Sequence, residues 1–358
     1  HRVLTPRDAE VASFLRYAEA LLSGTTTIVD MWRYMHGSAH AAAQLGIRAV
    51  LVPYVAEHPA HDYFETLQTN EALIRQWHGG ADGRVQVWVG LEHMFYGTPD
   101  AWKRAIDICR HYDVGFHTHS NESRFDVDET VRRHGKRPIE ALAAFGLLDA
   151  PRTLLAHCVW LSDAEITLLA ERGVGVAHNP ISNMKLASGA ARTVDLLAAG
   201  VAVGLGTDGE KENNSLDLFE EMKFASLLQK VSTLDPTIGD PWEVLTMATI
   251  EGAKALGLDD VTGSLEAGKR ADIVMVDLGS IKFVPTFTAA NGNGANFNVA
   301  AHLVFTANGD DVDSVWVDGV RLVEGRTIRS VDEASVIATG QAAAEELFER
   351  RAAVLAAQ

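Results

Sequence analysis

The chain has 358 residues, of which 47% are hydrophobic, and its formal net charge is −17 at pH 7. This length and apolar content predict a large α/β domain with an accessory module. The negative charge argues against nucleic acid or an anionic membrane as a partner, because both require clustered Lys and Arg. The sequence also offers no apolar run of the length that spans a bilayer.

Cysteine content and the first residues indicate the cellular context. Two cysteines, Cys109 and Cys158, cannot form a disulfide framework, so a cytoplasmic location is expected. The first ten residues lack the apolar core of a signal peptide. They also lack an initiator Met, so we expect the chain to begin partway through a longer protein.

In chain order, seven short apolar runs alternate with helical patterns. The runs predict strands at 25–31, 47–55, 84–92, 114–119, 152–158, 173–179 and 201–209. The segments between them predict helices at 8–22, 99–112, 138–148 and 162–173, among others. Strands without polar alternation are typical of parallel sheets covered by helices. The pattern therefore predicts an α/β protein with a (β/α)₈ TIM-type barrel that lacks its first strand.

A different pattern follows residue 208. It predicts helices at 215–231 and 241–257, then strands at 271–278, 302–307 and 313–325, the last a hairpin that turns at a favoured Asp-Gly pair. These short strands predict a small β-sandwich module, and an Ala/Glu-rich helix ends the chain. The predicted domains are the barrel at 1–260, the β module at 261–330 and the C-terminal helix at 331–358.

Polar residues recur where the predicted barrel strands end. They are Asp30, Glu92, His119, His157, His178 and Asp208. Active sites of such barrels lie at the carboxyl ends of the strands. Trp32 and His93 also fall at these ends, and Asn183 follows the sixth strand, so these three are expected to bind substrate.

His117 and His119 have the spacing with which one strand presents two imidazoles to a metal ion. However, only about 90 residues separate them from Asp208, whereas a complete barrel needs about 200 residues or more. The strand 114–119 is therefore not the first of the barrel. His117 lies deeper along the strand than His119. A place in the core, or contact with a residue that itself binds the metal, is therefore favoured over direct metal ligation.

Several motifs along the chain resemble one enzyme superfamily. They are SGTTTIVDM (23–31), HTHSNES (117–123), HGKRPIEAL (134–142), LLAHCVWLSDAE (154–165), AHNPISNMKLASG (177–189), GLGTDG (204–209), NNSLDLFEEMK (213–223) and GSLEAGKRADIVMVDL (263–278). The chain resembles the amidohydrolase superfamily, in its cytosine deaminase-like branch. That branch includes the S-adenosylhomocysteine/methylthioadenosine deaminases and the triazine chlorohydrolases.

The resemblance implies a barrel that holds one divalent metal, with zinc preferred and iron, cobalt or manganese as alternatives. It implies that His119 and Asp208 bind the metal. Asp208 would also carry a proton from the attacking water to the leaving group, and His157 would stabilise the metal-bound hydroxide. Glu122 would protonate a ring nitrogen of the substrate. The His-x-His pair that the family carries on its first strand is absent from this sequence.

The function expected from this resemblance is hydrolytic deamination of a nitrogen heterocycle such as a purine, nucleoside or pterin, through a metal-bound hydroxide. One alternative is hydrolysis of a chloro- or alkylamino-triazine, a urea or an amide. A further alternative is a catalytically inactive barrel that acts as a binding subunit. The expected partner is a small heterocyclic substrate, and the family implies a homodimer.

Overall fold

The computed structural model describes residues 2–57, 63–288 and 297–356. Its first part alternates strands and helices, and the strands run parallel. The strands are β1 (Thr27–Trp32), β2 (Arg48–Pro53), β3 (Val85–Val87), β4 (Val89–Gly90), β5 (Phe116–Ser120), β6 (Thr153–His157), β7 (Gly175–His178) and β8 (Val203–Leu205). They pair in chain order, as β1-β2-β3 and β4-β5-β6-β7-β8.

The third predicted strand is interrupted at one residue. Only Trp88 separates β3 from β4, and its backbone N–H donates to Leu51 O of β2 at 3.0 Å. The two pieces therefore continue one path beside β2. All seven predicted parallel strands are present, so the α/β prediction is confirmed.

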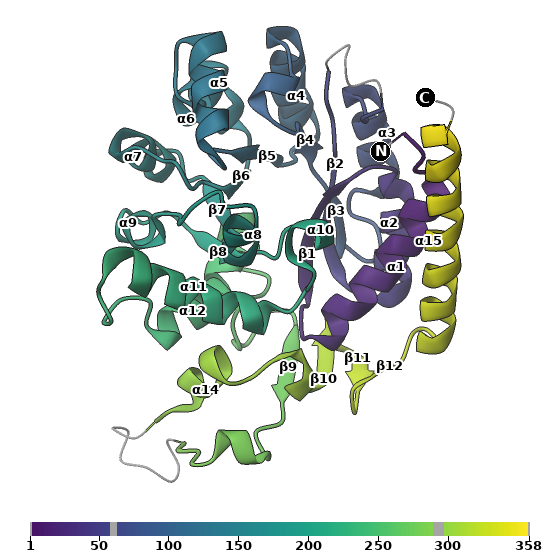
Figure 1. The fold of residues 1–358 in the computed structure, drawn as a ribbon, viewed down its shortest axis with the longest axis vertical. Coiled ribbons are helices and arrows are strands. Elements are labelled where there is room, and N and C mark those ends of the chain that lie inside the picture. Colours follow the sequence, from purple (N-terminus) through teal and green to yellow (C-terminus); the bar gives the residue numbers. More distant parts are fainter. Residues whose placement is uncertain (1, 58–62, 289–296, 357–358) are drawn as a thin grey trace.

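Helices connect and cover these strands (Figure 1). They are α1 (Pro6–Leu22), α2 (Met35–Leu45), α3 (Leu67–Trp77), α4 (Pro99–Tyr112), α5 (Arg124–His134), α6 (Pro138–Ala144), α7 (Asp163–Glu171), α8 (Pro180–Lys185), α9 (Thr193–Ala198), α10 (Glu210–Asn213), α11 (Leu218–Thr233), α12 (Pro241–Met247) and α13 (Ile250–Leu256). At the start of α7, Ser162 and Glu165 form a capping box. No helix in the described ranges combines the length and the apolar character that crossing a membrane would require.

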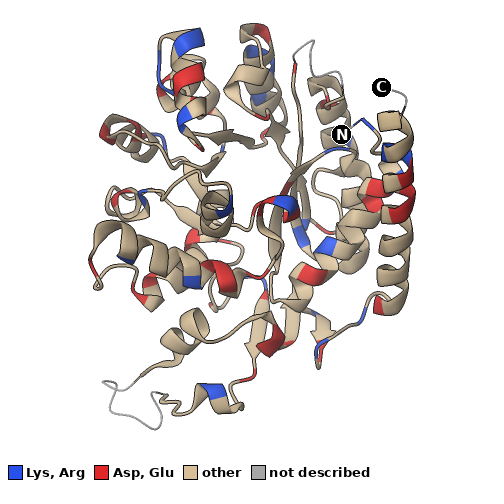
Figure 2. Ribbon diagram, in the orientation of Figure 1, with Lys and Arg blue, Asp and Glu red and all other residues tan. Residues whose placement is uncertain are grey.

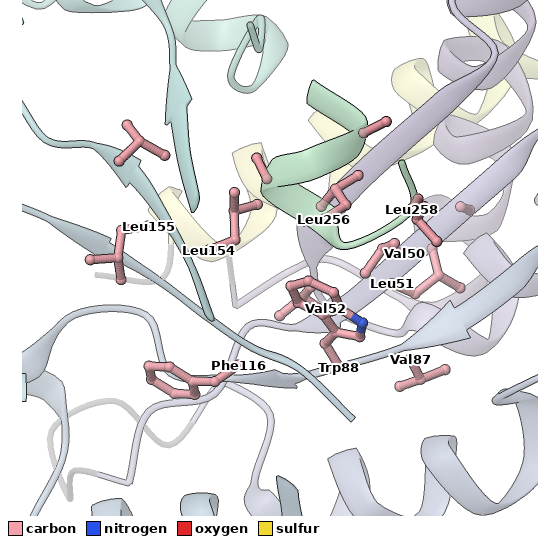
Figure 3. Packing of buried hydrophobic residues seen from close by; sticks show 14 of the residues in the cluster. Val50, Leu51, Val52, Val87, Trp88, Phe116, Leu154, Leu155, Leu256 and Leu258 are labelled. Carbon is pink, nitrogen blue, oxygen red and sulfur yellow. The ribbon is translucent and has the colours of Figure 1, made fainter. Parts of the chain in front are cut away.

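The core lies between the strands and these helices. Every residue of β2 and β6 is buried, as expected for strands covered on both faces. Figure 3 shows Leu51, Trp88, Phe116 and Leu154 from neighbouring strands within this core. The packing is close at β7, where a Cβ added to Gly175 would lie 2.4 Å from a backbone oxygen of α13.

The C-terminal part forms one antiparallel sheet of four strands in the order β12-β11-β10-β9. Its elements are β9 (Ile273–Val276), α14 (Val299–Phe305), β10 (Val312–Val317), β11 (Val320–Glu324), β12 (Thr327–Ile328) and α15 (Glu333–Ala356). The predicted hairpin turns at Asp318 and Gly319, both with positive φ. The predicted β module is present in the described residues as this single sheet, which packs against α1, and a second sheet that would complete a sandwich stays a prediction.

One predicted strand is wrong. Residues 302–307 belong largely to helix α14, which packs against α11 and α12. A short apolar run fits a buried strand or a buried helix equally well, and the preceding Ala300 and Ala301 extend the run to helical length.

Contacts join the C-terminal part of the chain to its first part. Figure 1 shows α15 lying beside α1, and a buried ion pair joins Arg48 of β2 to Asp272, at 2.9 Å between Nε and Oδ2. The division into domains at residues 260 and 330 stays a prediction.

Candidate active site

Four of the predicted site residues meet at the carboxyl ends of the parallel strands. Strand register sets His119 of β5 opposite Ala156 and Ser120 opposite His157 of β6. The two imidazole rings lie 5.4 Å apart, nearly parallel. His157 Nε2 is 3.8 Å from both Glu122 Oε2 and Asp208 Oδ2. His157 Nε2 thus lies near two carboxylates, with the ring of His119 stacked beside its own.

His119 is held in one tautomer by the backbone. Its Nδ1 lies 3.1 Å from Glu92 O, an acceptor, so Nδ1 must carry the proton and donate it. Burial and the neighbouring His93 and His157 lower the pKa of His119, which keeps the ring neutral. Its Nε2 is therefore left with a free lone pair, the form in which imidazole binds a metal.

His117 lies deeper in the strand. It is buried, and its Nδ1 donates to Leu154 O of β6 at 3.0 Å. Burial lowers its pKa to about 3. This histidine therefore serves the contact between two strands.

His157 is oriented by a residue expected to bind substrate. Its backbone has a positive φ of 71°, and its Nδ1 donates to Asn183 Oδ1 at 2.9 Å. Burial lowers the pKa of His157. Asn183, in α8, is fully buried, so its contact is with His157 and not with an open pocket.

Asp208 lies in a tight turn after β8, with a φ of 63°. Its Oδ1 accepts from its neighbour Gly209 N at 2.6 Å, and its Oδ2 accepts from Ser182 Oγ, also at 2.6 Å. Sequence reasoning missed Ser182, which is buried in α8. These two bonds fix the direction of the carboxylate.

The loop that carries Asp208 is anchored by a buried carboxyl group. Asn213 Nδ2 donates to Thr207 O at 2.8 Å and to Glu221 Oε1 at 2.5 Å. Burial raises the pKa of Glu221, in α11, to about 8. Sequence reasoning missed Glu221 as well, because nothing local distinguishes it from the other acidic residues of its helix.

Glu122 follows β5 and borders a second group of charges. Its backbone N–H donates to Asp126 Oδ2 at 3.0 Å, and burial raises the pKa of its side chain. His93 Nδ1 lies 2.7 Å from Glu92 Oε2, and its Nε2 lies 3.5 Å from Asp126 Oδ2. Burial alone would lower the pKa of His93, but these carboxylates outweigh it and raise the pKa well above its usual value.

Aromatic rings extend from this group toward β1. The chain of ring contacts is Trp32 to Tyr54 at 5.7 Å, Tyr54 to Phe64 at 4.8 Å and Phe64 to Tyr96 at 6.1 Å. Tyr54 also donates its hydroxyl to Glu92 Oε1 at 2.8 Å. Trp32, predicted from its strand-end position, thus belongs to an aromatic wall that the sequence pattern did not otherwise reveal.

Asp30 and His178, the other two polar residues predicted at strand ends, do not belong to the candidate active site. Asp30 accepts a hydrogen bond from Tyr17 of α1. His178 is fully buried, and neither of its ring nitrogens has a hydrogen-bond partner among the described residues.

Two groups of side chains have donor atoms close enough to share a cation. They are Glu92, His93 and His119, and His93, Glu122 and Asp126, each with all atoms within 4.8 Å. Both groups include His93, whose two nitrogens already face carboxylates. Glu92 Oε2 and His93 Nδ1 nevertheless lack a well-aligned hydrogen bond, although they lie 2.7 Å apart. Nitrogen and oxygen donors of this kind suit zinc, iron, cobalt or manganese.

Comparison with known proteins gives the family. The sequence profile of the Amidohydrolase family matches residues 2–322. A 5-methylthioadenosine/S-adenosylhomocysteine deaminase of Desulforudis audaxviator is 42% identical over 351 residues, 97% of this chain and 78% of that protein. A 5'-deoxyadenosine deaminase of Methanosarcina mazei is 40% identical over 348 residues, with the same two coverages of 97% and 78%.

Solved structures agree with the sequence relatives. An adenosine deaminase from Xanthomonas campestris with bound zinc has a TM-score of 0.89 and 30% identity, over 97% of this chain and 76% of that chain. An atrazine chlorohydrolase from Arthrobacter aurescens complexed with zinc has a TM-score of 0.85 and 26% identity, over 95% and 77%.

Parallel strands with imidazoles and carboxylates gathered at their carboxyl ends define the class of metal-dependent α/β hydrolases. The chain belongs to the amidohydrolase family. The resemblance predicted from the sequence motifs and the predicted enzyme class, a hydrolase that acts on C–N bonds, are thereby confirmed.

Proposed function

We propose that the protein deaminates the adenine ring of a 5'-substituted adenosine nucleoside. Water supplies the oxygen, the bond from the ring carbon to its amino group breaks, and the amino group leaves as ammonia. The observation that carries this proposal is the position of His157 Nε2, 3.8 Å from one oxygen each of Glu122 and Asp208. The names of relatives that are 42% and 40% identical support a nucleoside as the substrate.

The proposed metal ligands are His119 through Nε2 and Asp208. His119 fits because Glu92 O fixes its proton on Nδ1. His93 is the less suitable donor, because its two nitrogens face Glu92 and Asp126. A divalent cation at this position lowers the pKa of a water molecule, and the zinc bound to two structural relatives supports zinc.

The remaining steps are proton transfers between side chains and substrate. Asp208 takes a proton from the attacking water and passes it to the departing amino group. Glu122, whose pKa is raised by burial, donates a proton to a ring nitrogen. His157, whose Nδ1 proton is held by Asn183, accepts a hydrogen bond at Nε2 from the attacking water and so orients it.

Substrate binding is assigned to the surroundings of these groups. Trp32 offers an aromatic face for the ring system, and His93, whose ring stacks on that of His119 at 5.2 Å, stays the other predicted contact. Asn183 was expected to touch the substrate, but its burial behind His157 supports a role in orienting that imidazole.

The likeness to solved structures supports a closed barrel. We propose that the seven parallel strands belong to a closed (β/α)₈ barrel, because the zinc-bound adenosine deaminase superposes over 97% of the chain. We also keep the homodimer and the cytoplasmic location as proposals.

The test uses the protein as its own gene encodes it. Metal analysis should find one zinc or another divalent ion for each chain. The purified enzyme should release ammonia from 5'-methylthioadenosine, S-adenosylhomocysteine or 5'-deoxyadenosine, and a Glu122→Gln variant should not. Chloride or alkylamine release from a triazine, with no ammonia from nucleosides, would replace this proposal by the triazine alternative. A metal-free protein without either activity would favour the inactive binding subunit.

A further inference from the structure

One fully buried carboxylate near the candidate active site takes no part in the proposed reaction. The chain carries 48 Asp and Glu, spread over its helices (Figure 2). Of the acidic residues that the structure describes, only Glu165 and Glu221 are 0% exposed. Glu221 anchors the Asp208 loop, whereas Glu165, in the first turn of α7, bonds to other segments. A buried charge stays in a fold only when its partners compensate it, so the contacts of Glu165 indicate what it holds.

Glu165 accepts four hydrogen bonds from three places in the chain. Its Oε1 accepts from Asn121 Nδ2 and from Ile139 N, each at 3.2 Å. Its Oε2 accepts from Arg137 Nε at 2.7 Å and from Ser162 N at 2.9 Å. The carboxylate therefore joins the loop after β5 to the start of α6 and to the start of its own helix.

Asn121 lies directly before the proposed acid Glu122 and two residues after the proposed metal ligand His119. It is 0% exposed, and its φ of 54° lies in the left-handed region, which is uncommon for residues other than glycine. Such a backbone persists only where the surrounding contacts hold it. The bond from Asn121 Nδ2 to Glu165 supplies one of these contacts, and Ser120 Oγ, which donates to Asn121 Oδ1 at 2.8 Å, supplies another.

The same asparagine fixes the turn after β6. Its backbone oxygen accepts from Val159 N at 3.1 Å and from Trp160 N at 2.9 Å. This turn begins at His157, whose φ of 71° is also left-handed. Asn121 Nδ2 and Arg137 Nη2 both donate to Trp160 O, at 3.1 and 2.5 Å. One asparagine thus links the turn that carries the proposed acid to the turn that carries His157.

We propose that Glu165 is a positioning residue for the deamination, which acts through Asn121 to place Glu122 against His157. The carboxylate holds the asparagine, and the asparagine holds both turns with Glu122 Oε2 at 3.8 Å from His157 Nε2. The motifs HGKRPIEAL and LLAHCVWLSDAE supply the two halves of the ion pair, Arg137 and Glu165. This inference rests on the proposed function, because it assigns reacting groups to both turns.

Glu165→Gln tests the assignment, because whichever oxygen the amide replaces, its NH₂ group faces two N–H donors. We expect kcat for ammonia release to fall by roughly 10-fold or more, since the acid is displaced from its partner. Asp272→Asn is the matched control, because it also removes a buried carboxylate from an ion pair, with Arg48 at the amino end of β2. Both variants should melt at a lower temperature, but Asp272→Asn should keep the kcat of wild type.

A double variant separates positioning from a general loss of stability. Glu122→Gln removes the acid that Glu165 is proposed to place. Adding Glu165→Gln to it should therefore lower kcat by less than about threefold further, because the two changes act on one group and are not additive. Independent effects would instead multiply to the full further loss.

Hydrogen exchange gives a measurement that needs no activity. The N–H groups of Val159 and Trp160 donate to Asn121 O, so Glu165→Gln should speed their exchange by about 10-fold or more compared with Asp272→Asn. If Glu165→Gln does not fold, Arg137→Gln loosens the same carboxylate from a partly exposed position and replaces it in each measurement.

Three results would overturn the proposal. They are an unchanged kcat in Glu165→Gln, a full further loss in the double variant, and exchange in the turn after β6 that matches Asp272→Asn. A wild type that releases chloride or alkylamine from a triazine, and no ammonia, would end the proposed function instead, and the same variants then test the positioning on that reaction. For a wild type without either activity, hydrogen exchange alone decides.

Discussion

The candidate active site and the outer face of α11 depart from the usual distribution of residues in opposite directions. The site buries charged and polar groups, among them Glu92, His157 and Asn183. The outer face of α11, formed by Leu227 and Val231, is exposed to solvent. Buried polar groups and exposed apolar patches are the informative exceptions in a folded protein. The chemistry proposed for the site accounts for the first exception, and the second leaves side chains that have few contacts to lose.

The two regions differ in how tightly the chain holds them. In the site, hydrogen bonds direct the side chains expected to react, with Asn183 holding His157 and Ser182 holding Asp208. The apolar side chains on the outer face of α11 are fixed only by the helix that carries them. Changes in the site should therefore alter chemistry, whereas changes on the outer face should leave both chemistry and stability nearly unchanged.

The largest effect is expected from Asp208→Asn. The amide cannot accept the proton from water and is a weaker metal ligand, so kcat/KM should fall by about 10³-fold or more. Ammonia release and metal content measure the two consequences separately. Asp30→Asn, at another half-buried strand-end aspartate, should retain the activity of the folded enzyme. Equal losses in both variants would remove Asp208 from the reaction.

A smaller loss is expected from Glu122→Gln, about 10²-fold or more in kcat, because glutamine cannot donate a proton to the ring. Metal content should stay unchanged, since Glu122 is not a proposed ligand. Glu129→Gln, on α5, the helix that follows Glu122, serves as the control. If Glu122→Gln lost its metal instead, the carboxylate would belong to the metal site and its role as the acid would fail.

The sequence predicted the frame of the site because that frame depends on local patterns. Uninterrupted apolar runs such as 152–158 mark strands buried on both faces, and each run ends in a polar residue where the barrel edge lies. His119, His157 and Asp208 could be found in this way. Their chemical roles came from the resemblance to a family.

The contacts between distant segments could not be predicted. Ser182 and Asp208 are 26 residues apart, and no periodicity links a serine in α8 to a carboxylate in the turn after β8. The same holds for Glu221 and Asn213, which meet only once α11 has packed. Helix α14 was missed because its apolar run is too short for its period to be recognised.

Ser182→Ala tests whether these long-range contacts matter to the site. Loss of a hydrogen bond to a charged group should lower kcat/KM by roughly 10-fold or more, because the Asp208 carboxylate gains freedom to rotate. Ser226→Ala removes another buried serine, bonded to Gly239 O at 2.7 Å, and should lower stability without changing the activity of folded molecules. The two variants should therefore differ in kinetics and not in melting temperature.

Glu221→Gln tests the buried anchor of the Asp208 loop by its dependence on pH. The folded-state pKa of Glu221 is raised by burial from 4.5 to about 8. Its contribution to the free energy of unfolding is therefore fully present below pH 4.5 and is lost as pH rises through about 8. Glutamine does not titrate, so the melting temperature of wild type should fall by about 2 °C or more relative to the variant between pH 5 and pH 8. A constant difference across this range would mean that Glu221 is ionised in the folded protein.

The smallest effect is expected from Val231→Ser. The side chain is exposed and the two residues have similar helix propensities, so the free energy of unfolding should change by less than about 0.5 kcal/mol. Ammonia release should keep the kcat/KM of wild type, because Val231 contributes no group to the site. Val320→Ser, at a comparably exposed valine in β11, should likewise leave kcat/KM unchanged. If Val231→Ser lowered kcat/KM, or lowered the free energy of unfolding by more than about 1 kcal/mol, the outer face of α11 would belong to the packed and working part of the protein, and the contrast between the two regions would fail.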